Sequence, residues 1–493
     1  MIRMMRFLSE RRTVVVALGL VALVSYEWSA LAPKANAIPA FARKYNFACN
    51  VCHVPGFPKL NDFGNVFRDH GFQLGSDNDL PEFEGIQMGY WPVSLRSTVG
   101  YRTITYSQNG AVSGPQAGGD VTTGSFGFKT LNLLSYGILA KNVSFGLIYN
   151  PALQSANFQT GASQGDLPNA FVRLNNLERF VGGGTQNSYL LNVKVGKYEP
   201  ELPFSAFRNP TQLNTPIVIY NYQAGSAYAS ANFPNNNRVN ATAYSNNTLS
   251  SLQRGQPGIE VAGIKETKAT HGYFRYSLNA FSNSQAVGNQ GGRGYYFYGH
   301  ATQSFDGYGI VSGHRVGMSG WFGDAPTQTN SLTTSQGTAT GGQKFYRFSV
   351  DASTTYDGQV NLFGAYIHAN DSSELMPTTG ANATPIQNRQ DAIWNGGFVE
   401  LDWYPPQLFG TTGWLFLYRY DLVRNEQQGN RAVRGDYGNV DSHVWMSRYF
   451  FHFSSRTDIA WHTEYNWFST RATGNNGQDT IGQMFFTGFD FAL

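Results

Sequence analysis

The chain of 493 residues is rich in glycine and aromatic residues, with 55 Gly, 36 Phe and 28 Tyr, and only 14% of its residues are charged. The formal net charge of +3 comes from the first 37 residues, which hold five basic and two acidic side chains, so the remainder is neutral. Because nucleic-acid binding requires a basic surface, we predict no nucleic-acid partner.

The N-terminus has the features of an export signal. Four arginines among the first 12 residues precede an apolar run at residues 14–24, and Ala35 and Ala37 form an A-x-A cleavage site. The run is shorter than the ~20 residues that a membrane-spanning helix needs. We therefore predict a signal peptide over residues 1–37 and a mature chain that begins at Ile38.

The next feature is the sequence Cys49-Asn50-Val51-Cys52-His53, which contains the only two cysteines of the chain. C-x-x-C-H is the attachment motif of c-type haem. Each thiol can form a thioether to a haem vinyl group, and the imidazole can bind the iron as the proximal axial ligand. A zinc site would need a second Cys/His pair, and a thioredoxin motif would need a βαβ context. We predict one covalently bound haem c held by Cys49, Cys52 and His53.

Residues 38–91 are predicted to form a small cytochrome c module. Pro58 can occupy the first turn of a helix. In such a helix Leu60, Phe63, Phe67 and His70 share one face. The acidic, turn-rich residues 75–84 are predicted to be a connector. So short a segment cannot form an ordinary independent core, so we expect the haem and the rest of the chain to supply its apolar contacts.

The second axial ligand of the haem iron has two candidates. His70 shares the apolar helical face with Phe67, and Met88 precedes the first predicted strand. A Met ligand raises the reduction potential relative to His, which would suit an acceptor of electrons from iron(II). An open sixth position is the third alternative.

Residues 92–493 show short segments of alternating polarity separated by polar turns. In the segment from Trp414 to Leu422, for example, aromatic residues alternate with residues that include Arg419 and Asp421. This pattern predicts an all-β fold, an outer-membrane β-barrel of about 16 strands with the N-terminal α-helical haem module as a plug. A β-barrel closes because an open sheet edge in lipid leaves backbone groups unpaired. A soluble sandwich or propeller is the alternative.

Strand parity also predicts which side chains face the lumen and which face lipid. The predicted polar, lumen-facing set comprises Glu400, Asp402, Arg419, Asp421, Arg448, His452, His462 and Glu464. We expect a hydrated, charged lumen. The more specific alternative is a path that leads a cation through the lumen toward the haem. The last residues alternate up to Leu493, as in the terminal strand of outer-membrane barrels. We therefore predict outer-membrane lipid as the surroundings and both termini on the periplasmic side.

The combination of these features resembles a known family. The segments Phe41-Ala42-Arg43-Lys44-Tyr45, CNVCH and the stretch from Phe57 to Asp69, followed by a large barrel, resemble the outer-membrane monohaem cytochrome–porin fusions of iron-oxidising bacteria. The resemblance in detail covers residues 38–101. It implies oxidation of Fe(II) at the outer face, with electrons passed through the single haem to a periplasmic c-type cytochrome or similar acceptor.

Several functions remain open from the sequence. The principal hypothesis is an Fe(II)-oxidising cytochrome c oxidoreductase that acts as an electron conduit. The alternatives are a diffusion porin with a structural haem plug, electron export to external acceptors, and peroxidase or gas-sensing chemistry at an open haem position. No catalytic nucleophile–base pair or nucleotide-binding motif is evident in the sequence.

Overall fold

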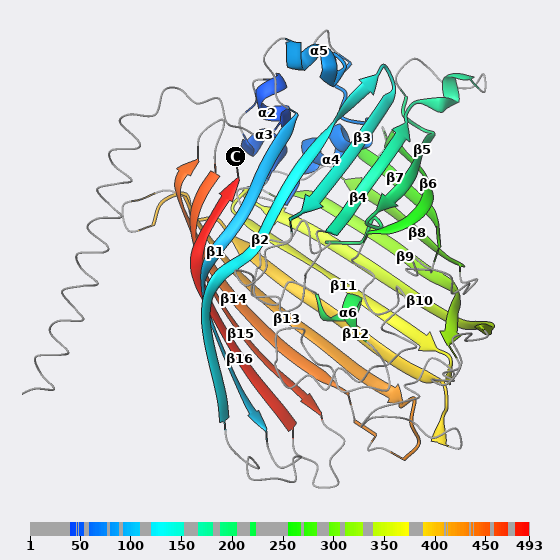
Figure 1. The fold of residues 1–493 in the computed structure, drawn as a ribbon, viewed down its shortest axis with the longest axis vertical. Helices are drawn as coiled ribbons and strands as arrows, with labels where there is room; N and C mark the ends of the chain where they lie inside the picture. The colour runs from blue at the N-terminus through cyan, green and yellow to red at the C-terminus, as the bar shows by residue number, and fades with distance from the viewer. Residues whose placement is uncertain are drawn as a thin grey trace, which may run out of the picture. The chain divides into compact units, whose positions relative to one another are not determined.

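The computed structural model contains a closed antiparallel barrel of 16 strands, in which each strand pairs with its neighbours in the chain and β1 pairs with β16 (Figure 1). The predicted barrel and its strand number are confirmed. The strands are β1 (Val93–Gln108), β2 (Asp120–Ala140), β3 (Val143–Asn150), β4 (Asp166–Leu174), β5 (Asn192–Tyr198), β6 (Gln256–Thr267), β7 (Gly272–Ser282), β8 (Tyr295–Phe305), β9 (Val311–Gln328), β10 (Ala339–Tyr356), β11 (Val360–Asp371), β12 (Ala392–Trp403), β13 (Trp414–Gln427), β14 (Val440–Phe453), β15 (Asp458–Arg471) and β16 (Asp479–Ala492).

The structure describes a defined part of the chain. The described residues are 40–45, 47, 49–53, 59–75, 79–87, 92–108, 120–151, 166–180, 188–204, 217–222, 255–267, 271–282, 295–305, 311–328, 339–373, 388–408, 411, 413–432, 435–436, 438–453, 458–471 and 479–492. The predicted signal peptide lies outside them and stays a prediction.

The alternation predicted from the sequence is found in the strands. In β13, Leu415, Leu417, Arg419 and Asp421 are buried while the residues between them are partly or fully exposed. The same two-residue period recurs in β15 and at the end of β7. Successive side chains of a strand point to opposite faces, so the buried set faces the interior and the aromatic set faces outward.

The barrel closes through a seam between its first and last strands. β1 and β16 pair in register from Arg96 with Ala492 to Gln108 with Thr480. Gly100 and Gly488 face each other in this seam, and a Cβ atom on Gly488 would lie 2.2 Å from the Val99 carbonyl oxygen. The two glycines allow the strands to approach there. Closure leaves no unpaired sheet edge.

The helices before the barrel are short. They are α2 (Ala40–Tyr45), α3 (Cys49–Cys52), α4 (Asp62–Asp69) and α5 (Glu82–Gln87). Tyr45, Phe67 and Phe72 form their buried core, and Phe41 and Phe47 pack against it. In the described part of the chain, no helix is long and apolar enough to span a membrane.

Two details of this helical segment differ from the sequence prediction. The main helix begins at Asp62 instead of near Pro58, which lies outside the described residues, because the Asn61 side chain caps it by accepting a hydrogen bond from the Gly64 amide. The predicted connector is also partly helical, since α5 begins at Glu82.

A further short helix, α6 (Val218–Asn221), packs against the inner wall of the barrel. Val218, Ile219 and Tyr220 are fully buried in the largest apolar cluster, together with Trp321 and Trp394 of the wall. The Val218 amide donates to Asp421 Oδ1 of β13 at 3.2 Å, and the Tyr220 hydroxyl donates to the Pro203 carbonyl at 2.6 Å. This segment therefore occupies part of the barrel interior.

Candidate cofactor site

The C-x-x-C-H motif forms the short helix α3 and is held by the start of α4. The Asn61 amide donates to the Cys52 carbonyl at 3.0 Å, and the Asn61 side-chain amide donates to the Val51 carbonyl at 3.0 Å. A Cβ atom on Gly64 would lie only 2.1 Å from the Cys52 carbonyl oxygen, so only glycine allows this contact. These contacts fix the turn that presents Cys52 and His53.

A cavity of about 330 Å³ adjoins this turn, and Cys52 and His53 are among its lining residues. Its volume lies within the range of small-molecule and cofactor sites. Part of the lining is apolar and largely aromatic. Its residues are Phe41, Phe47, Leu60, Phe67 and Phe72 from the helical segment, and Leu134, Tyr136 and Phe171 from the wall.

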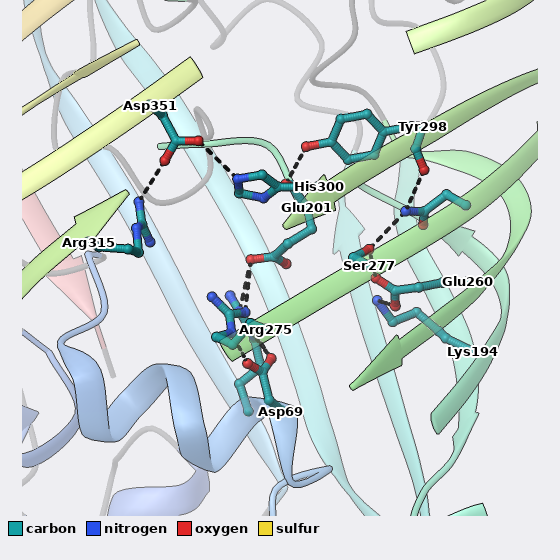
Figure 2. Close-up of polar contacts among 12 residues, drawn as sticks. Asp69, Lys194, Glu201, Glu260, Arg275, Ser277, Tyr298, His300, Arg315 and Asp351 are labelled. Atoms are coloured by element: carbon teal, nitrogen blue, oxygen red, sulfur yellow. Dashed lines mark hydrogen bonds and ion pairs between the residues drawn. The ribbon is translucent and has the colours of Figure 1, made fainter. Parts of the chain in front are cut away.

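The lining also includes charged side chains from α4 and the barrel wall. Figure 2 shows Asp69 at the end of α4 beneath Arg275 of β7, with Glu201 above them. Arg275 forms ion pairs with Asp69 and Glu201, and Arg68 is 2.8 Å from Glu201. Nearby, Lys194 of β5 pairs with Glu260 of β6.

This charged cluster lowers the pKa of Asp69. Burial alone raises it, but the Arg275 and Arg68 guanidinia outweigh burial and hold the pKa of this carboxyl below its usual value. Asp69 is therefore ionised at neutral pH and links α4 to the wall.

Contacts made by Arg173 and Lys59 also attach the helical segment to the barrel. Arg173 of β4 donates to the main-chain carbonyls of Arg68 and Asp69, both at 2.9 Å. Lys59 is 2.7 Å from Asp402 of β12 and also donates to Asn361 of β11. Within the segment, Lys44 is 2.8 Å from Glu82. The segment is thus bound to distant parts of the barrel circumference.

The candidate haem ligands predicted from the sequence do not all line the cavity. Cys52 and His53 line the cavity, and Cys49 begins α3. His70 does not line the cavity: its ring stacks on Tyr189 with centroids 4.3 Å apart. Burial lowers the pKa of His70 and raises the pKa of Tyr189 to about 12, so both rings are neutral at pH 7. Met88 lies outside the described residues.

Sequence reasoning missed one histidine of the cavity. His300 of β8 lines it, and its Nε2 atom is 3.0 Å from Asp351 Oδ2 of β10 (Figure 2). Strand parity could have placed His300 on the inner face, because successive residues of β8 alternate between the two faces and the small residues Gly299 and Ala301 would then face outward. No local motif joins it to Asp351, which is 51 residues away.

The predicted polar lumen set is found on the inner wall of β12–β16, where it forms ion pairs. Glu400, Asp402, Arg419, Asp421, His462 and Glu464 are fully buried, and Arg448 is nearly so. Arg419 lies 2.8 Å from Asp421, and Arg448 lies 2.6 Å from Asp490. His462 is 3.0 Å from both Glu464 and Asp490. The His452 side chain is not among the described ones.

Comparison with known proteins gives similarity of fold only. No family model and no curated protein matches the chain. OprB of Pseudomonas putida is 11% identical, with a TM-score of 0.46, covering 90% of this chain and 99% of that one. The outer membrane channel DcaP of Acinetobacter baumannii is 11% identical, with a TM-score of 0.42, covering 80% and 96%. OmpF of Salmonella typhi, solved with daunomycin, is 11% identical, with a TM-score of 0.43, covering 81% and 97%.

Proposed function

We propose that this chain is an outer-membrane electron conduit that carries one covalent c-type haem and passes electrons from extracellular Fe(II) to a periplasmic c-type cytochrome. One observation carries the proposal. The C-x-x-C-H turn opens onto an aromatic cavity inside a closed barrel, and Cys52 and His53 both line that cavity.

The residues around the cavity fit a haem. Cys49 and Cys52 would form the thioethers, and His53 would provide the proximal nitrogen. When bound, the haem would supply one-electron redox chemistry. The aromatic lining residues suit a flat apolar macrocycle, and the basic lining residues suit its carboxylates.

The surrounding residues orient the motif and exclude water. Asn61 and Gly64 fix the position of the Cys52 carbonyl, and therefore the turn that carries His53. Phe67 and Phe72 are buried and line the cavity. Arg173 and Arg275 hold the end of α4 against the wall. These contacts keep the site rigid, which limits reorganisation during electron transfer.

The outer surface of the barrel supports a membrane location. Exposed apolar side chains occur on most strands, including Val195, Leu278, Phe322 and Phe348. A band of such residues is what a transmembrane barrel presents to lipid. The first and last strands begin and end at the same rim, beside α2 and α3 (Figure 1). We assign this rim to the periplasmic side.

A diffusion channel with a structural haem module is the second candidate. The closed barrel with a charged inner wall favours it, because porins combine these features. The C-x-x-C-H motif favours the conduit, because passive diffusion requires no haem. Electron export to an external acceptor uses the same architecture in the opposite direction.

The test uses the purified full-length protein in detergent and its Cys49→Ala/Cys52→Ala variant. We expect peroxidase-active haem stain on a denaturing gel for the wild type and none for the variant. Oxidised wild type should then show reduced haem absorbance after mixing with Fe(II). Haem that Fe(II) leaves oxidised, together with ion conductance in liposomes, would instead establish the diffusion channel. Haem with a very low midpoint potential would indicate electron export.

A further inference from the structure

Arg173 is a buried cation that lines the cavity. It extends inward from β4 and is only 6% exposed. Its two terminal nitrogens donate to carbonyls of α4, whereas its Nε atom is buried and has no hydrogen-bond partner among the described residues. The neighbouring ion pairs join Arg68 and Arg275 to Asp69 and Glu201, and none of them includes Arg173.

The Asp69 and Glu260 carboxylates interact electrostatically with Arg173, but they form ion pairs with Arg275 and Lys194. The carbonyls at the end of α4 compensate Arg173 only in part, because they carry partial charges. The remaining Nε–H is a donor next to the cavity that Arg173 lines. A carboxylate in the cavity would satisfy both the charge and this donor, since Arg pairs strongly with carboxylates.

The composition of the cavity lining supports an anionic ligand with an apolar body. Its five basic side chains exceed its four carboxylates by one. The basic set is Arg68, Arg96, Arg173, Lys194 and Arg275, and the acidic set is Asp69, Glu199, Glu201 and Glu260. Aromatic side chains make up much of the remaining lining. A ligand that matches this composition has an apolar body and carboxylate groups.

We infer that Arg173 binds a carboxylate of the ligand in this cavity, a propionate of the haem, and thereby raises the reduction potential of the site. This inference rests on the proposed function. A cation close to the ligand disfavours the oxidised, more positive state of the iron. Arg173 is a positioning residue, because it acts through the carboxylate and does not touch the iron.

The first experiment is a potentiometric titration of the purified holoprotein and its Arg173→Gln variant. We expect Arg173→Gln to lower the equilibrium constant for haem reduction about tenfold, a fall of about 59 mV for a one-electron couple. The control is Arg424→Gln, because Arg424 is half-exposed, pairs with Asp441 and does not line the cavity. The control should retain the wild-type potential.

A second variant separates charge from displacement of α4. Asp69→Asn weakens the same end of α4 but removes a negative charge. If the carboxylate contact is correct, Arg173→Gln lowers the potential and Asp69→Asn raises it. A shift of both variants in the same direction would mean that α4 has merely moved, and it would overturn the inference.

A binding experiment tests the inference even if the protein carries no covalent haem. The full-length Cys49→Ala/Cys52→Ala protein is titrated with haem and with haem dimethyl ester, in which both carboxylates are blocked. We expect tighter binding of the free acid, by about tenfold, and loss of that preference when Arg173→Gln is added. Equal affinity for the two compounds, or no binding of either, overturns the inference. Missing covalent haem in the wild type counts only against the proposed function.

Discussion

Gly64 is the residue on which the geometry of the haem motif depends most directly. A Cβ atom at this position would lie 2.1 Å from a main-chain oxygen, which cannot rotate away. The contact therefore couples the sequence of α4 to the position of Cys52. Glycine is required here because two main-chain segments approach closely, and not because of its φ angle.

We predict that Gly64→Ala separates α3 from α4 and costs about 1–3 kcal/mol of stability, as overpacking does. The haem stain per molecule of protein should fall, because the motif is displaced from the cavity. Gly435→Ala is the matched control, since a Cβ atom added at Gly435 would meet no atom of the described residues within 4 Å. Equal haem content in both variants would show that the contact is unimportant.

The sequence predicts His70 as a candidate distal ligand of the haem iron, whereas the structure places its ring against Tyr189. Its stack on Tyr189 leaves it outside the cavity lining. His70→Phe preserves a ring that can stack there. We therefore expect the visible spectrum and midpoint potential of the holoprotein to stay unchanged. A spectral shift on substitution would instead establish His70 as the distal ligand.

The lowered pKa of Asp69 predicts how the attachment of the helical segment to the barrel depends on pH. Its pKa is lowered in the folded protein, so its contribution to stability is present above the unfolded pKa of about 3.9 and is lost as pH falls through the folded value. Limited proteolysis between pH 7 and pH 3 should reveal release of the segment at the acid end. Asp69→Asn should cost roughly 3 kcal/mol at pH 7 and remove that part of the pH dependence.

At the scale of elements, the helical segment is attached to the wall at separate points of the circumference. α4 contacts β4 and β7, while Lys59 reaches β11 and β12. Because the segment is short and its own core contains few residues, these polar contacts define its place in the barrel.

We predict that Lys59→Met destabilises this attachment by about 3 kcal/mol, because Asp402 is then buried without its cation. Trypsin sensitivity of the helical segment in the folded, heat-modifiable barrel provides the measurement. The double variant Lys59→Met/Asp402→Leu removes the stranded charge and should recover most of the resistance. Failure of the double variant to recover would point to the Asn361 contact instead.

How much of the molecule the sequence predicts depends on whether a feature is formed by neighbouring or by distant residues. The strands of the barrel could be predicted because their two-residue period is local, as in β13. The cavity could be predicted only in part, because Asp69 and Arg275 are 206 residues apart and no local pattern joins them. The capping role of Asn61 likewise becomes evident only once Gly64 is placed in the first turn of the helix.

At the scale of the whole molecule, the interior determines whether the barrel conducts ions. The α6 cluster packs against the inner wall, and α4 is joined to the wall through the ion pair between Asp69 and Arg275. We predict that deletion of residues 38–85 raises single-channel conductance in planar bilayers relative to the wild type. Equal conductance of the two proteins would show that the segment does not obstruct the pore.

The seam between β1 and β16 also sets an order of events during biogenesis. The two strands lie almost 400 residues apart in the chain, as Thr98 and Asp490 illustrate, so the wall is completed last. Ala492 of β16 lines the same cavity as Cys52. Pairing of β1 with β16 therefore completes the wall of this cavity as well as the barrel.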